Sequence, residues 1–166
     1  MPVKPHIVER PQQPYAAIPV SVTMSDFGEL APPLIGEVAE WLASRGAAPA
    51  GAPFFRYRVI DMARALELEV GFPTATVVAG AGRVHSATLP GGRYATLVHQ
   101  GHPSELVDVT AELLAWADDE GLRWDVRDSS RGEQWGCRME SSLTDPRVEP
   151  DMSKWETQLS FRLADG

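Results

Sequence analysis

The sequence predicts a fold made of two tandem strand-helix-strand-strand units, related by a pseudo-twofold axis and each contributing a sheet. Three observations support this prediction. The same order of strand-like and helix-like segments occurs twice along the 166 residues, each half has one helix with regularly spaced apolar residues, and matching residues recur at nearly equal intervals. We therefore expect one domain over residues 1–166, with repeat one at about 15–75 and repeat two at about 83–163.

The first repeat contains one helix among strand-like segments. Pro32 and Pro33 mark its start, because proline is tolerated in the first turn of a helix, and Gly46 stands where a left-handed cap would end it. The apolar face of this helix has helical spacing and consists of Leu34, Ile35, Val38, Trp41 and Leu42. The strand-like segments, recognised by composition or by period-two alternation, are residues 15–23, 54–60 and 66–70.

The second repeat shows the same order of elements. Its helix opens at Pro103-Ser104 and stops near Gly121, and its apolar face consists of Leu106, Val109, Leu113, Leu114 and Ala117. Its strand-like segments are residues 93–99, 134–143 and 155–163. The anchors that match between the repeats are Tyr15-Ala16 with Tyr94-Ala95, Trp41 with Trp116, and Gly46 with Gly121. They indicate a duplication, and clefts between packed repeats are natural ligand sites.

Composition and charge exclude several classes of protein. The 43% hydrophobic and 23% charged residues are typical of a folded chain, and the formal charge of −8 without a basic stripe argues against direct nucleic acid binding. No apolar run approaches the roughly 20 residues that a membrane span needs, and residues 1–15 lack the apolar segment of a signal peptide. The lone Cys137 excludes a disulfide framework and is interpreted as packed core. We expect a cytoplasmic protein with no membrane partner.

No strong catalytic or cofactor-binding motif occurs in the sequence. It contains no G-x-S-x-G, no H-E-x-x-H and no phosphate-binding loop. His99 and His102 have no third ligand nearby, so we predict no metal site and no cofactor. Trp41, Trp116 and Trp135 lie on elements expected to face the interface between the repeats. Large aromatic rings can stack on planar ligands and attract cations, and core packing is the alternative for each of them.

Glu140 is the sharpest single candidate for a site residue. It lies in the middle of a predicted strand, on the face expected to be opposite Trp135, Cys137 and Met139. A carboxylate in a central strand either is solvated or occupies a cavity, where burial raises its pKa. Arg138 shares the face of Glu140, so an exposed ion pair is the alternative, and alternation does not decide between the two.

Several motifs, taken in order, resemble the GyrI-like small-molecule-binding domain, which also serves as the effector-binding domain of multidrug-sensing regulators. They cover nearly the whole chain and are Phe54-Phe55-Arg56-Tyr57, LELEVGFP at 66–73, LPGGRYA at 89–95, His99-Gln100-Gly101, the helix end with Trp116, Glu140 before Leu143-Thr144-Asp145-Pro146, and Trp155-Glu156-Thr157. The resemblance implies an α+β fold of two β-α-β-β repeats with a central ligand groove. It also implies that Glu140 lies at the floor of this groove among aromatic residues.

The sequence departs from the family pattern beside Glu140. Ser142 stands where the usual E-x-Y motif has Tyr, which removes a stacking ring and a proton donor. Tyr57, Tyr94 or Trp135 could compensate. The residues before Tyr15 are too few for the helix-turn-helix module of the family's regulators, so we expect a stand-alone member.

These observations lead to three functional hypotheses. The first is a binding protein that sequesters a hydrophobic, aromatic or cationic drug or toxin and so confers resistance, with a negative charge and walls supplied by Glu140, Trp41, Tyr57, Tyr94, Trp116 and Trp135. The second is a hydrolase that opens the cyclopropane of DNA-alkylating natural products, with Glu140 as the base and a tyrosine hydroxyl or a Trp N–H as the donor. The third is an interaction protein that modulates DNA gyrase, with an acidic surface that mimics the charge of DNA.

Overall fold

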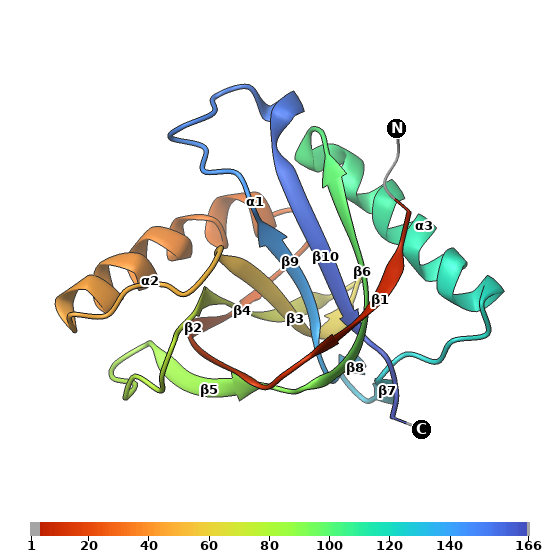
Figure 1. The fold of residues 1–166 in the computed structure, drawn as a ribbon, viewed down its shortest axis with the longest axis horizontal. Coiled ribbons are helices and arrows are strands. Elements are labelled where there is room, and N and C mark those ends of the chain that lie inside the picture. Colours follow the sequence, from red (N-terminus) through yellow and green to blue (C-terminus); the bar gives the residue numbers. More distant parts are fainter. Residues whose placement is uncertain (1–3, 166) are drawn as a thin grey trace.

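The computed structural model describes residues 4–165 and contains a curled antiparallel sheet with two long helices on one side (Figure 1). The strands are β1 His6–Arg10, β2 Gln13–Val22, β3 Phe54–Asp61, β4 Ala65–Pro73, β5 His85–Leu89, β6 Gly92–Gln100, β7 Val126–Ser129, β8 Gly132–Trp135, β9 Arg138–Ser142 and β10 Glu156–Arg162. The helices are α1 Phe27–Leu30, α2 Pro33–Ser44 and α3 Leu106–Asp119, with short 3-10 turns at Pro103–Glu105 and Met152–Lys154.

The strand order fits the predicted duplication and gives the α+β fold. It is β1-β6-β10-β9-β3-β4-β2-β5, so from the central β9-β3 pair outward each repeat places its second, third and first main strands in the same order. The halves form one continuous sheet instead of a sheet each, because β3 and β9 pair with Phe55 opposite Glu140. The edge strands are exchanged: β1 precedes repeat one but pairs with β6, and β5 precedes repeat two but pairs with β2.

Both predicted helices and their glycine caps are present. Gly46 and Gly121 have φ values of 68° and 69°, and the N–H after each glycine donates to a helix carbonyl at 3.0 and 2.9 Å. α2 packs on β4 and β2, while α3 packs on β6. The buried residues of the two helices are Leu34, Val38, Leu42, Val109, Leu113 and Ala117. No helix in residues 4–165 has both the length and the apolar character needed to cross a membrane.

The two faces of the sheet carry separate cores. The helix face, on which α2 and α3 pack, holds the larger core, including Leu68, Val70, Leu97, Leu159 and Phe161. The opposite side, which we call the inner face, brings together residues of strands that are far apart in the sheet order. These residues are Tyr15, Ala17, Phe54, Leu89, Tyr94, Cys137 and Met139. The sheet therefore curls around its inner face.

The segment 134–143 is not the single strand that the sequence predicts. It breaks at Gly136, whose N–H donates to the carbonyl of Asp125 at 2.8 Å and whose own carbonyl accepts a hydrogen bond from Arg56 at 2.8 Å. These bonds take the place of strand pairing at this residue and separate β8 from β9. A side chain at position 136 would collide with the carboxylate of Asp125, so a larger residue here would require that carboxylate to move.

Candidate functional site

Glu140 and Tyr57 form the centre of the candidate site on the helix face. They lie on the central strands β9 and β3, where Glu140 is paired with Phe55 on one side and Leu159 on the other. Both side chains are half-buried, and the Tyr57 hydroxyl lies close enough to the Glu140 carboxylate for each group to shift the pKa of the other. Burial raises the pKa of Glu140, although the nearby Tyr57 hydroxyl and the charge of Arg138 oppose this shift. Burial also raises the pKa of Tyr57, and the charge of Glu140 adds to the effect.

Strand alternation explains why these groups meet. Phe55 and Tyr57 are alternate residues of β3, and Glu140 and Ser142 are alternate residues of β9, so all four side chains project from one face. Ser142 pairs with Thr157, and both side chains are small. The phenol beside Glu140 therefore comes from the neighbouring strand β3, and not from position 142 on its own strand.

Phe27 on the short helix α1 packs over this part of the sheet. Its ring meets Phe55 edge to face at 5.2 Å between centroids and stacks on Tyr57 at 6.2 Å with an interplanar angle of 9°. The sequence analysis did not single out Phe27, because a helix of one turn leaves no periodic pattern. The aromatic wall on this side of Glu140 thus comes from α1 and β3.

Arg138 forms the other border of the site and lies on aromatic rings. Its guanidinium carbon is 4.8 Å from the ring centroid of Trp135 and 4.5 Å from that of Phe161, and burial lowers its pKa. Trp135 and Phe161 also contact Trp124, with ring centroids 5.7 and 5.8 Å from it. Arg138 and Glu140 are both half-buried, which differs from the exposed pair that the sequence left open as an alternative.

The face predicted for Trp135 is wrong. Alternation along a single strand predicts that Trp135 lies with Cys137 and Met139, opposite Glu140. In the structure Trp135 belongs to the helix-face core, while Cys137 and Met139 belong to the inner-face core. The break at Gly136 shifts the alternation between β8 and β9, which reverses the expected orientation. Trp135 and Glu140 therefore share a face.

The other aromatic residues named from the sequence lie elsewhere. Tyr94 is buried on the inner face, where its hydroxyl donates to the carbonyl of Pro90 at 2.6 Å, so it does not join Glu140. Trp41 on α2 and Trp116 on α3 are half-buried and pack against the helix-face core from opposite helices. Figure 1 shows β3, β9 and β10 running between these two helices.

Cys137 and the two histidines considered from the sequence lie apart from Glu140. Cys137 is buried on the inner face, and burial raises the pKa of its thiol. His99 lies 3.3 Å from the Glu105 carboxylate, and His102 caps the following turn. Among residues 4–165 there is no group of three His, Cys, Asp or Glu side chains arranged to hold a metal ion. The Glu140–Tyr57 pair is therefore the group on the helix face with the clearest potential for chemistry or charge recognition.

The structure thus has a curled sheet that carries two helices, with a half-buried carboxylate on the strands between them. The family description "GyrI-like small molecule binding domain" matches residues 3–131. The chain belongs to this family, as its motifs predict. The comparison with curated proteins found no match.

Solved structures with the same fold include three informative neighbours. EcmrR in complex with DNA has a TM-score of 0.76 at 17% identity, and our chain is covered fully but spans 59% of the EcmrR chain. SAV2435 bound to tetraphenylphosphonium has a TM-score of 0.67 at 7% identity, with 97% of our chain and 94% of that chain covered. A hydrolase from Listeria innocua has a TM-score of 0.65 at 17% identity, with 97% and 92% covered. At these identities the similarity establishes the fold alone.

Proposed function

We propose that this protein binds hydrophobic, cationic small molecules on the helix face and so sequesters a drug or toxin. The observation that carries this proposal is the half-buried Glu140–Tyr57 pair, set among Phe27 and Phe55 on the central strands. An aromatic surface attracts a lipophilic cation through its rings, and a carboxylate held by a phenol gives that cation a fixed counter-charge. The binding of tetraphenylphosphonium by a protein of the same fold supports this choice of ligand class.

The test compares a cation with a neutral molecule of similar shape. Tetraphenylphosphonium is titrated against the protein while Trp fluorescence is recorded, and triphenylphosphine oxide serves as the neutral probe. We expect Glu140→Gln to weaken binding of the cation about tenfold, as loss of a charged contact of about 1.4 kcal/mol would do. Binding of the neutral probe should be unchanged. Glu112→Gln on the exposed side of α3 is the matched control.

Two results would reject this proposal. If the cation does not bind saturably, the helix face is not a site for this ligand class. If Glu140→Gln and Glu112→Gln alter cation affinity equally, the carboxylate of Glu140 acts only through net charge and has no contact with the ligand.

A second candidate function is hydrolytic opening of a cyclopropane in a DNA-alkylating compound. The observation that favours it is the contact between a carboxylate and a phenol on one face, supported by a hydrolase among the proteins of this fold. Ionised Glu140 would take a proton from water while the water oxygen bonds to a ring carbon. The ring C–C bond breaks, its electron pair moves to the conjugated carbonyl, and Tyr57 donates a proton there.

Mass spectrometry separates the two functions. Incubation with a cyclopropane-bearing alkylator should give a product heavier by one water, and both Glu140→Gln and Tyr57→Phe should slow its formation. Stoichiometric binding of the alkylator without turnover would exclude the hydrolase and leave the binding function intact.

A further inference from the structure

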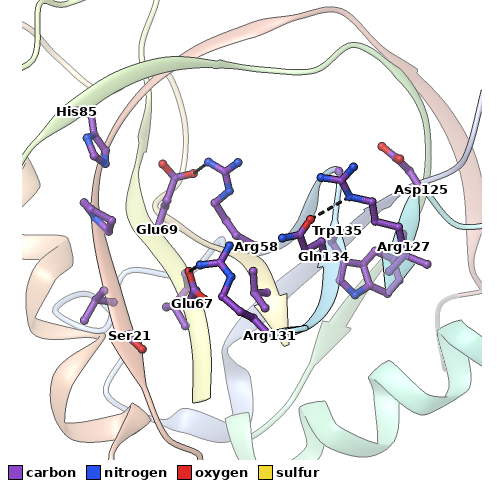
Figure 2. A pocket seen from close by; sticks show the side chains of 16 residues that line it. Ser21, Arg58, Glu67, Glu69, His85, Asp125, Arg127, Arg131, Gln134 and Trp135 are labelled. Carbon is purple, nitrogen blue, oxygen red and sulfur yellow. Dashed lines mark hydrogen bonds and ion pairs between the residues drawn. The ribbon is translucent and has the colours of Figure 1, made fainter. Parts of the chain in front are cut away.

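A large cavity lies on the side of the sheet away from Glu140. Its volume is about 860 Å³, within the roughly 300–1,000 Å³ of small-molecule sites, and it is bordered by β3, β4 and the β7-β8 hairpin (Figure 2). Glu67 and Glu69 of β4 line it, and they alternate with the residues of β4 that belong to the helix-face core. The cavity therefore opens on the inner face. We call it the arginine cavity, after Arg58, Arg127 and Arg131 in its lining.

Arg58 follows Arg56 at the alternate position of β3, so it lies on the inner face, and it stands at a bulge of this strand. The register against β4 shifts between Tyr57 and Val59, which leaves Arg58 without a partner residue in the ladder. Its side chain is 52% exposed and extends to the Glu69 carboxylate at 3.7 Å. Bulges redirect side chains and are common next to functional sites.

The β7-β8 hairpin supplies the other two arginines. Arg131 pairs with Glu67 at 2.9 Å. Arg127 donates to the neutral amide oxygen of Gln134 at 2.9 Å. Figure 2 shows Arg58 and Arg131 beside the two glutamates, with Arg127 across the cavity from them. Guanidinium groups thus lie on two sides of the same cavity.

Cations outside the cavity already neutralise two of its three carboxylates. The Glu69 oxygen nearest Arg58 accepts hydrogen bonds from the Tyr15 hydroxyl at 2.8 Å and from the buried Arg56 at 3.3 Å. The Asp125 carboxylate is held by Arg162 at 2.9 Å. Neither Arg56 nor Arg162 lines the cavity, so both pair with these carboxylates from outside it, and Arg162 also pairs with Asp165 at 3.0 Å.

This arrangement leaves Arg58 and Arg127 without a close carboxylate partner in the cavity. Glu67 is matched by Arg131, while Arg58 has only a long contact to an oxygen that is already bound. Within residues 4–165, Arg127 makes no ion pair within 4.0 Å. The arginine cavity is therefore locally positive in a chain whose formal charge is −8.

We propose that the arginine cavity binds a small organic anion that carries carboxylate or phosphate groups, with Arg58 and Arg127 as its main contacts. The planar guanidinium fork binds both kinds of group through two parallel hydrogen bonds. His85 and Gln134 in the lining can donate further hydrogen bonds. This site goes beyond the proposed function, because it lies on the other face and selects the opposite charge.

Calorimetric titrations with citrate and with pyrophosphate test this proposal. Citrate represents carboxylate ligands, and pyrophosphate represents phosphate ligands. We expect one saturable site for at least one probe. Arg58→Gln and Arg127→Gln should each weaken it about tenfold or more, and binding should weaken strongly at high salt. Arg147→Gln is the control, because Arg147 is 89% exposed and pairs with Asp145 away from the cavity. Glu140→Gln should leave both titrations unchanged.

The outcomes either identify the anionic group of the ligand or reject the proposal. Binding of citrate alone assigns a carboxylate ligand, and binding of pyrophosphate alone assigns a phosphate ligand. If neither probe binds to the unmodified protein, the proposal is wrong. It is also wrong if Arg147→Gln weakens binding as much as Arg127→Gln, since the effect would then be one of net charge.

Discussion

At the residue scale, the environment of Glu140 links cation binding to pH. Burial favours the protonated carboxylic acid and raises the pKa of Glu140 above its ordinary value. A bound cation favours the ionised form, so binding must remove the proton wherever the free carboxyl group carries one.

We therefore expect cation affinity to rise with pH up to the raised pKa of Glu140 and to level off above it. Below this pKa, tetraphenylphosphonium binding should release a proton, which calorimetry in buffers of different ionisation enthalpy detects. In Glu140→Gln this slope should disappear. A slope that persists in this variant would show that another group titrates.

Arg56 and Glu69 form a second residue-scale feature, in which a charge pair is buried on the inner face. Their side chains are 7% and 5% exposed, and Arg56 also donates to the Tyr15 hydroxyl and the Gly136 carbonyl, each at 2.8 Å. Burial and the charge of Glu69 raise the pKa of Tyr15, so its hydroxyl stays protonated and keeps donating.

Replacing one member of this pair should lower the free energy of unfolding far more than replacing both. We expect Arg56→Met to lower the free energy of unfolding by about 3–5 kcal/mol, because it leaves a buried carboxylate without its cation. The double variant Arg56→Met/Glu69→Leu should recover most of the loss in urea titrations. Arg64→Met, in an exposed pair with Asp61, is the control and should change stability by less than about 1 kcal/mol. Equal losses in the single and double variants would contradict this account.

The sequence identifies the central residues of the helix-face site but not its surroundings. Glu140 and Tyr57 can be selected because each lies in a recognisable strand and is an unusual residue for its position. Tyr94 is misleading, because alternation along β6 does not reveal which face a buried tyrosine occupies. The arginine cavity has no sequence signature, since Arg58 and Arg127 lie on distant segments that only the tertiary structure brings together.

At the element scale, the pairing of β4 with β2 depends on a glycine in β4. A Cβ atom on Gly71 would collide with the backbone carbonyl of Ala16 and approach the Cα of Ala17 at 2.7 Å. Because backbone atoms of a paired strand cannot move aside locally, the β2-β4 ladder requires glycine at this position.

Two alanine substitutions of glycine should therefore have opposite effects. Gly71→Ala should lower the melting temperature sharply or prevent folding. Gly36→Ala in α2, where nothing lies within 4 Å of the added methyl group, should raise stability by about 0.5–1 kcal/mol. Thermal unfolding followed by circular dichroism measures both. A neutral Gly71→Ala would mean that the two strands are less tightly paired than described.

Prediction from the sequence succeeds for elements with internal patterns and fails for those defined by their neighbours. The two helices and the inner strands of each repeat have apolar periodicity or capping glycines that can be recognised locally. The strands β1 and β5 are mostly exposed and lack alternation, since each is a strand only through pairing with the other repeat. The break between β8 and β9 cannot be recognised from the sequence for the same reason, because it depends on hydrogen bonds that Gly136 donates to Asp125 and accepts from Arg56.

At the scale of the whole molecule, four strand pairings join the two halves of the sheet. β3 pairs with β9 and β8 in the centre, β1 with β6 at one end and β5 with β2 at the other. Unfolding one half would leave the other without these four pairings, so we expect the protein to unfold as one unit.

The tryptophans allow this cooperativity to be measured. Trp41 is the only tryptophan before residue 116, so the fluorescence of Trp41→Phe reports the second half alone. Its urea midpoint should coincide with that of far-UV circular dichroism, which reports both halves. Separate midpoints would show that the halves unfold independently.

The exchange of β1 and β5 also bears on the segment between β4 and β5, which links the two halves of the chain. Residues 75–77 and 79–83 of this link are exposed, and each half already gives a strand to the other. A nick in the link would cut the backbone without removing any ladder of the sheet. The halves thus resemble two subunits that exchange strands and are joined by one covalent connection. Polypeptides 1–78 and 79–166 should therefore assemble into a heterodimer when refolded together.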